Sequence, residues 1–169
     1  PYMNDSSHSY IAWNFLARPQ FFDVQKYAGD GGNNTIQHDL GVEPGFIMIK
    51  SISSADSWWC YHAELPNEVL YISSTSGALS APGWITVDDS SFSFNGNGNS
   101  FNRNGSDYVA YLFAKDTPYV KSGKYTATGG GSTVNVGFKP RWVLIKKSSS
   151  SSNWFIIRSE EHTSELQSR

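Results

Sequence analysis

The chain has 169 residues, 38% of them hydrophobic and 15% aromatic, so it is long and apolar enough to bury a core. Its formal net charge of −2, without a basic stripe, argues against nucleic-acid binding, and no apolar run reaches the roughly 18 residues of a membrane span. Cys60 is the only cysteine, which excludes an intrachain disulfide. The sequence begins without Met or a signal-peptide pattern, and we expect residue 1 to be an arbitrary cut.

The first apolar segment, residues 10–15, follows a polar start and recurs near the end of the central region. Residues 108–113 repeat it 98 positions later, with Tyr, Ala and Phe identical. Residues 108–114 are apolar or aromatic on both alternating faces, which predicts a strand buried on two sides. We therefore expect residues 1–17 to hold the last strand of one module and residues 18–114 to form a complete module of usual domain size.

Within residues 18–114, short apolar runs alternate with segments rich in Gly, Ser and Asn, which is typical of an all-β fold. Alternation in one expected strand places Trp58, Cys60 and His62 on one face and Trp59 and Tyr61 on the other. No window has helical spacing, so the sequence predicts an antiparallel, sandwich-like module of about eight strands without significant helix. The expected strands are residues 21–28, 35–40, 46–50, 58–62, 69–72, 84–87, 91–94 and 108–114.

The region after residue 114 repeats the first half of this module. Residues 139–146 align with residues 43–50, with Pro on Pro and Ile-Lys on Ile-Lys, and Trp154 falls on Trp58. We expect residues 115–157 to be the truncated first half of the next module in a tandem array, in which each module has its neighbours in the same chain as partners.

Residues 158–169 differ in character from the rest of the chain. Eleven consecutive codons of a common sequencing-library adapter, in one reading frame, translate to residues 158–168. The alternative is a genuine charged C-terminal segment. We favour the adapter origin and expect residues 158–169 to lie outside the fold.

Several ordered motifs carry a resemblance to a known family. They are FDV at residues 22–24, the Gly-rich turn at 29–34, LGVEPG at 40–45, IMIK at 47–50, DSW at 56–58 and YVAYLFA at 108–114. Together they resemble a β-rich repeat domain of unknown function found in bacteriophage and marine metagenomic proteins, often near lectin/glucanase-like sandwich domains. The resemblance implies location in a virion, assembled in the cytoplasm of a bacterial host, and brings no catalytic or binding residues with it.

His–carboxylate combinations are the first candidates for chemistry. His38-Asp39, His62 and Glu64 lack the HxH or HExxH spacing of a metal site, and both histidines fall beside apolar residues. Hydrogen-bonded, partly buried histidines are therefore favoured over metal ligands or acid–base residues. Cys60 has no basic neighbour in the sequence, which favours an inert packed thiol.

The remaining polar motifs have simpler explanations. Asp88-Asp89 is an adjacent pair in a tight turn, so a solvated turn is favoured over a glycosidase acid and base or, with the Asn-rich residues 95–104, a Ca²⁺ site. The serines lack a G-x-S-x-G turn, and residues 129–133 lack the lysine of a phosphate loop. The sequence thus assigns no catalytic, metal-binding or cofactor-binding residue.

Aromatic residues remain as candidates for ligand stacking. Trp58, Trp59 and Trp84, with Tyr61 and Tyr71, would suit sugar rings if they shared a surface, although core packing is favoured. We therefore expect a non-catalytic structural or adhesive module of a virion tail fibre or appendage. The alternative is a weak carbohydrate-binding module for host-surface glycans, and a fragment of a glycan-active enzyme is the third possibility.

Overall fold

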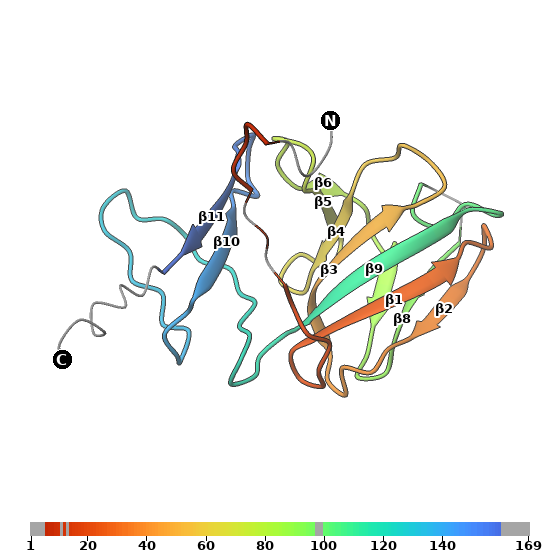
Figure 1. Cartoon of the computed structure of the whole chain (residues 1–169), viewed down its shortest axis with the longest axis horizontal. Helices are drawn as coiled ribbons and strands as arrows, with labels where there is room; N and C mark the ends of the chain where they lie inside the picture. The colour runs from red at the N-terminus through yellow and green to blue at the C-terminus, as the bar shows by residue number, and fades with distance from the viewer. Residues whose placement is uncertain (1–5, 11, 13, 97–99, 160–169) are drawn as a thin grey trace.

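The computed structural model describes residues 6–10, 12, 14–96 and 100–159, and in this part of the chain every regular element is a β-strand. Eleven strands form three antiparallel sheets, and none of the described residues is helical (Figure 1). Consequently, the described residues contain no helix that is long and apolar enough to cross a membrane. The prediction of an all-β, antiparallel fold is confirmed.

The largest sheet has six strands, and two smaller sheets accompany it. Its order is β1 (Phe22–Ala28), β9 (Asp107–Ala114), β3 (Pro44–Ser51), β4 (Trp59–His62), β5 (Glu68–Tyr71) and β6 (Leu79–Ser80). The second sheet has the order β2 (Asn34–Gln37), β8 (Ser91–Phe94) and β7 (Ile85–Val87). The third consists of β10 (Trp142–Lys146) and β11 (Trp154–Arg158).

The main core lies between the six-stranded and the three-stranded sheets. Residues of one parity point inward from each strand, as the two-residue period of a strand requires. The inner residues of the large sheet include Tyr27, Ile47, Ile49, Tyr61, Val69, Tyr108, Ala110 and Leu112, and those of the small sheet include Ile36, Ile85, Phe92 and Phe94. These two faces make the sandwich that the alternating pattern predicted.

Strand β9 is the centre of the large sheet, because it pairs with β1 on one side and with β3 on the other. Tyr108, Ala110 and Leu112 are fully buried on its inner face, and the Tyr108 ring stacks on Tyr27 at 5.1 Å. On its outer face Phe113 is buried, whereas Val109 and Tyr111 are half-buried. The predicted central strand is therefore confirmed, with its outer face less completely covered than its inner face.

The earlier copy of this strand, at residues 10–15, has a different structure. Residues 10, 12 and 14–17 do not lie in a strand, and residues 11 and 13 lie outside the described part of the chain. Strand β9 is hydrogen-bonded to both neighbouring strands, whereas no described strand pairs with residues 10, 12 or 14–17. Phe15 instead packs against Phe22, Phe113 and Trp142, at centroid distances of 5.5, 5.6 and 6.1 Å.

The hairpin β10–β11 pairs in the same way as β3–β4. Trp142 lies opposite Arg158 and Val143 opposite Ile157. The residues 96 positions earlier, Phe46 with His62 and Ile47 with Tyr61, are opposite each other in β3–β4. The sequence alignment of the two regions therefore coincides with their strand register.

Residues 115–141, which were expected to form the first strands of a second module, contain no strand. Only an isolated bridge joins Asp116 to Lys121. Strands β1 and β2 pair with β9 and β8, which come much later in the chain, whereas β3 and β4 pair with each other. Pairing of the kind made by β1 and β2 thus depends on segments far along the chain, whereas a hairpin pairs within itself.

The C-terminal segment was expected to pack on nothing from residue 158 onward. Arg158 is instead the last residue of β11, opposite Trp142, and Ser159 donates its amide to Arg141 O at 3.0 Å. The expectation is wrong at these two residues. Their backbone groups continue the hydrogen bonding between β10 and β11, and this bonding does not depend on the identity of the side chains. Residues 160–169 lie outside the described part of the chain.

Candidate binding groove

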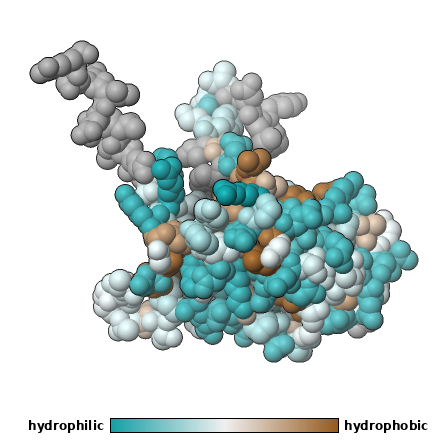
Figure 2. All heavy atoms as spheres, turned by 90° about the horizontal axis from the view of Figure 1, so that it is seen from below, coloured by the Kyte–Doolittle hydropathy of each residue, from teal (hydrophilic) through white to brown (hydrophobic). Residues whose placement is uncertain are grey.

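The outer face of the large sheet contains a groove of about 530 Å³ between β1, β9, β3 and the segments around them. Apolar and aromatic side chains dominate its lining. The lining residues are Asn14, Phe15, Phe22, Val24, Met48, Trp58, Ile72, Tyr111 and Phe113. Figure 2 shows one face of the molecule, which is mainly hydrophilic and carries separate apolar patches. Grooves of this composition suit ligands or partners with an apolar face.

Trp58 and Tyr111 form the aromatic part of this groove. Trp58 immediately precedes β4 and is half-buried, and its ring lies 6.0 Å from that of Tyr111 at an interplanar angle of 26°. The Nε1 of Trp58 donates to no acceptor among the described residues, and it is not enclosed by protein. This nitrogen is therefore available to a ligand or to a neighbouring molecule.

Trp59 and Trp84 lie in the sandwich core, on the opposite side of the sheet from Trp58. Trp84 is 7% exposed and donates its Nε1 to Glu68 O at 3.2 Å. Trp59 contacts the rings of Trp84 and Phe101 at 5.8 and 4.8 Å. A single stacking platform made of Trp58, Trp59 and Trp84 does not form, because the strand period turns Trp59 inward.

The two tyrosines proposed with them are also withdrawn from the surface. Tyr61 is 4% exposed, and burial raises the pKa of its hydroxyl to about 12. Tyr71 is half-buried and meets Trp59 edge to face at 5.0 Å. Of the five aromatic residues considered, only Trp58 lines the groove.

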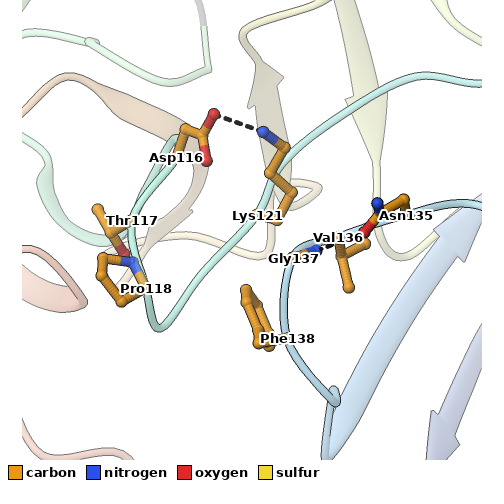
Figure 3. Close-up of a pocket in the computed structure, with 8 residues that line it drawn as sticks. All are labelled: Asp116, Thr117, Pro118, Lys121, Asn135, Val136, Gly137 and Phe138. Atoms are coloured by element: carbon orange, nitrogen blue, oxygen red, sulfur yellow. Dashed lines mark hydrogen bonds and ion pairs between the residues drawn. The ribbon is translucent and has the colours of Figure 1, made fainter.

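A second hollow, of about 650 Å³, lies among the loops that follow β9 (Figure 3). Its lining comes from residues 116–118, Lys121 and residues 135–138. Lys121 forms an ion pair with Asp116, and Gly137 donates its amide to Asn135 Oδ1 at 2.9 Å. The charged groups in this hollow are thus already paired with each other, and no strand holds them.

The His–carboxylate candidates do not come together. His38 is buried, with its Nε2 3.2 Å from Asp88 O, whereas His62 accepts a hydrogen bond from Glu64 N at 3.1 Å. Burial lowers the pKa of His62. The Glu64 charge opposes this effect, and the Lys124 charge adds to it. Among the described residues, no three His, Cys, Asp or Glu side chains are placed to hold a metal ion.

Asp88 closes the β7–β8 turn. Its carboxylate accepts hydrogen bonds from the amides of Ser90 and Ser91, both at 2.7 Å, and from both hydroxyls at 2.9 and 2.8 Å. The amide of Ser90 is the largest of the effects that lower the pKa of Asp88 to about 2. The solvated-turn interpretation fits this geometry, since the carboxylate caps its own turn.

Cys60 is enclosed on the outer side of the large sheet. It is 1% exposed and packs with Phe22, Phe46, Leu70 and Phe113. Burial raises the pKa of its thiol to about 12, so little reactive thiolate forms at neutral pH. The interpretation of Cys60 as a packed thiol agrees with this environment.

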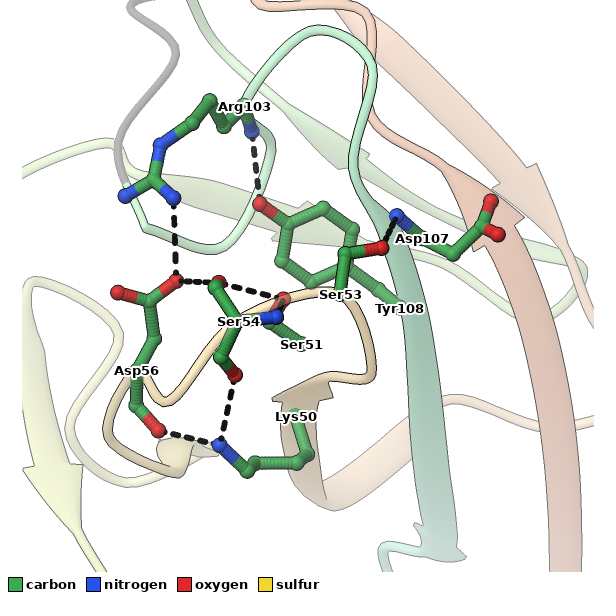
Figure 4. A network of polar contacts seen from close by, with 8 residues as sticks. All are labelled: Lys50, Ser51, Ser53, Ser54, Asp56, Arg103, Asp107 and Tyr108. Atoms are coloured by element: carbon green, nitrogen blue, oxygen red, sulfur yellow. Dashed lines mark hydrogen bonds and ion pairs between the residues drawn. The ribbon is translucent and has the colours of Figure 1, made fainter.

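A polar network holds the β3–β4 loop against the start of β9 (Figure 4). Lys50 Nζ donates to Asp56 O at 2.5 Å, and the Asp56 carboxylate accepts from Ser54 Oγ at 2.5 Å and from Arg103 Nη1 at 3.4 Å. The Ser54 hydroxyl, followed by the Arg103 charge, lowers the pKa of Asp56. Asp107 N donates to Ser53 Oγ at 2.9 Å. The network fixes the loop.

The β10–β11 hairpin contains the same lysine contact and uses it at a junction. Lys146 Nζ donates to Ser152 O at 2.5 Å, as Lys50 does to Asp56 O 96 positions earlier, and also to Thr75 O at 2.8 Å. Trp154 Nε1 donates to Tyr71 O at 3.0 Å. The hairpin is thereby joined to β5 and to the loop that follows it.

Two buried residues were missed in the Asn-, Gly- and Ser-rich run 95–105. Phe101 is 2% exposed in the main core, and Asn102 is fully buried. Phe101 is the one aromatic residue in this otherwise polar run, and that feature could have indicated its burial. The burial of Asn102 depends on partners about 70 residues away, so its own segment carries no sign of it.

These features define an all-β sandwich with an appended hairpin and an aromatic groove on its outer face. The chain matches the family described as the domain of unknown function DUF7483 over residues 2–169, and it belongs to that family. No curated protein and no solved structure matches it.

Proposed function

We propose that this protein is a non-catalytic structural module of a tandem array, in which successive copies pack through the outer faces of their large sheets. The common register of β3–β4 and β10–β11 carries this proposal. In this reading β10–β11 is the second copy of β3–β4, and its contacts with β5 are contacts between modules. The lysine-to-carbonyl bond found in both hairpins supports the same assignment.

The packing of the hairpin is the kind expected of a permanent junction. Leu144 and Trp154 contact the outer apolar cluster that contains Phe46 and Leu70. Trp142 stacks on Phe113 at 6.4 Å with an interplanar angle of 16°. Apolar burial and backbone hydrogen bonds thus act together, and each well-buried large apolar side chain contributes about 1.5–3 kcal/mol.

The virion setting is a further part of the proposal, and it rests on the motif resemblance alone. A tail fibre or appendage needs rigid units repeated along one chain. A sandwich with an apolar groove and an apolar cluster on its outer face fits that need.

A pair of substitutions in β11 tests the structural role. Trp154→Ala removes the donor to Tyr71 O and an apolar contact, so we expect the hairpin to detach and its amides to lose most of their protection from hydrogen exchange. Phe155→Ala is the matched control, because Phe155 is 53% exposed on the other face of the strand. Equal protection in the two variants would contradict packing through this face.

Weak binding of host-surface glycans at the groove is a second candidate function. The observation that favours it is the half-buried Trp58, stacked on Tyr111, with a free Nε1 and with Asn14 on the lining. The apolar face of a sugar ring suits such a surface. One shallow contact is weak, but several tethered copies raise the effective concentration of each later contact.

A glycan array probed with the multimerised chain tests this candidate. We expect weak binding that Trp58→Ala abolishes and that Tyr125→Ala, which removes an exposed aromatic residue outside the groove, leaves intact. If the multimer binds no glycan, the glycan-binding function is contradicted and the structural function remains as the proposal. Release of sugar from the array would contradict both proposals and identify an enzyme.

A further inference from the structure

We propose that the free edge of β10 is an acceptor site for an added β-strand with the sequence pattern of β9. This inference rests on the proposed equivalence of β10–β11 with β3–β4. Strand β3 lies between β4 and β9, whereas β10 pairs with β11 alone among the described strands. The edge of β10 that corresponds to the β9 side of β3 therefore presents backbone groups that pair with no described strand, and an added strand can satisfy them.

The exposed face of the hairpin supports the assignment. Val143, Ile145, Phe155 and Ile157 are equivalent in register to Ile47, Ile49, Trp59 and Tyr61. Ile47 and Ile49 are fully buried beneath the three-stranded sheet, whereas Val143 and Ile145 are half-buried and Phe155 and Ile157 are 53% and 55% exposed. The hairpin thus has the apolar inner face of a sandwich, but this face is less completely covered than that of β3–β4.

The segment before the hairpin points to the same missing strand. Tyr125 and Val134 lie 98 positions after Tyr27 and Ile36, which are core residues of β1 and β2. Tyr125 and Val134 are 49% and 52% exposed, and neither lies in a strand. Because β1 pairs with β9, a β9-like strand on β10 also provides the edge on which residues near Tyr125 can pair.

The register of the added strand follows from β3 and β9. Phe46 lies opposite Phe113, Ile47 opposite Leu112 and Ser51 opposite Tyr108. A β9-like strand is therefore expected to place its Phe113 opposite Trp142, its Leu112 opposite Val143 and its Tyr108 opposite Lys147. In a tandem array the next module supplies this strand from the same polypeptide. An isolated β9 peptide serves as its substitute.

The first experiment measures binding of a labelled peptide of residues 106–115, with an added lysine at each end for solubility, to the full chain by fluorescence anisotropy. We expect saturable binding and at least a tenfold loss of affinity for the peptide with Ala110→Pro and Tyr111→Pro. These adjacent prolines remove two successive amide donors, one of which must face β10. No binding by the parent peptide, or equal binding by the proline peptide, overturns the proposal.

The second experiment tests the site and the register by disulfide formation. Lys147→Cys in the full chain should cross-link to the peptide with Tyr108→Cys several-fold faster than to the peptide with Val109→Cys, which places its thiol on the other face. The buried Cys60 competes little, since its pKa is raised to about 12. Equal rates overturn the proposal. The Trp154→Ala exchange experiment is independent of both peptides, so failure of the tandem-module function is distinguished from failure of this site.

Discussion

At the scale of single residues, buried polar side chains fix the loops of this protein. Asn102 Oδ1 accepts from Asp30 N at 3.2 Å and from Asn34 Nδ2 at 3.0 Å. Its Nδ2 donates to Asp30 Oδ1 at 2.9 Å and to Gly32 O at 2.8 Å. One fully buried amide thus connects the run before β9 to the Gly-rich loop between β1 and β2.

Replacing Asn102 should be costly for this reason. Asn102→Ala leaves several groups around a buried site without partners, and we expect the free energy of unfolding to fall by about 3 kcal/mol. Urea denaturation provides the measurement. The control is Asn95→Ala in the same run, because the exposed Asn95 makes one hydrogen bond, to Gly83 O, and should cost less than about 1 kcal/mol. Equal losses would show that Asn102 does not organise the loop.

The turn carboxylate of Asp88 makes stability depend on pH in a defined window. Its pKa is about 2 in the folded chain, below the ordinary 3.8, so its stabilising effect is complete above about pH 4 and is lost as the pH falls toward 2. We expect Asp88→Asn to flatten the plot of unfolding free energy against pH between pH 4 and 2. A slope in the Asp88 variant that is parallel to the slope of the parent would refute the assignment.

At the scale of elements, the two faces of β9 should differ in their response to charge. Leu112 is fully buried, so Leu112→Asp combines lost apolar contacts with an unpaired buried carboxylate and should cost at least about 4 kcal/mol. Val109 is half-buried opposite Lys26 and Lys50, and a carboxylate there gains two cationic neighbours. Val109→Asp should cost about 1 kcal/mol or less. Thermal melts compare the two, and equal shifts would contradict the sidedness of β9.

The difference between local and distant pairing explains what the sequence could predict. The hairpins β3–β4 and β7–β8 join neighbouring segments, so alternation within each strand and the polar turn between them are local signals, and the strands themselves were predicted. The position of β9 between β1 and β3 depends on contacts between distant segments, which no local pattern specifies. The same limit applies to the groove, since Trp58 and Tyr111 meet across three strands. It also explains why the strands expected in residues 115–141 are not formed there, since similarity of local sequence does not supply distant pairing partners.

At the scale of the whole molecule, the sandwich and the appended hairpin meet at a close loop contact. Ala78 N donates to Ser148 O and Ser152 N to Thr75 O, both at 2.8 Å. A Cβ atom built on Gly77 would lie 2.7 Å from Ser148 O and 3.0 Å from Ser150 N. The hairpin therefore approaches the sandwich through a position at which only glycine leaves enough room.

Gly77→Ala tests whether this contact holds the molecule together. The added methyl group meets backbone atoms, so the loop must move away and both amide hydrogen bonds should weaken. We expect faster hydrogen exchange at Ala78 and Ser152, corresponding to about 1–2 kcal/mol of local stability, with little change at Leu112 in the sandwich core. The control is Gly130→Ala, because a Cβ atom at Gly130 meets nothing within 4 Å. Unchanged exchange in the Gly77 variant would mean that the two loops separate without consequence, and that the side-chain contacts of Trp142, Leu144, Lys146 and Trp154 hold the hairpin in place.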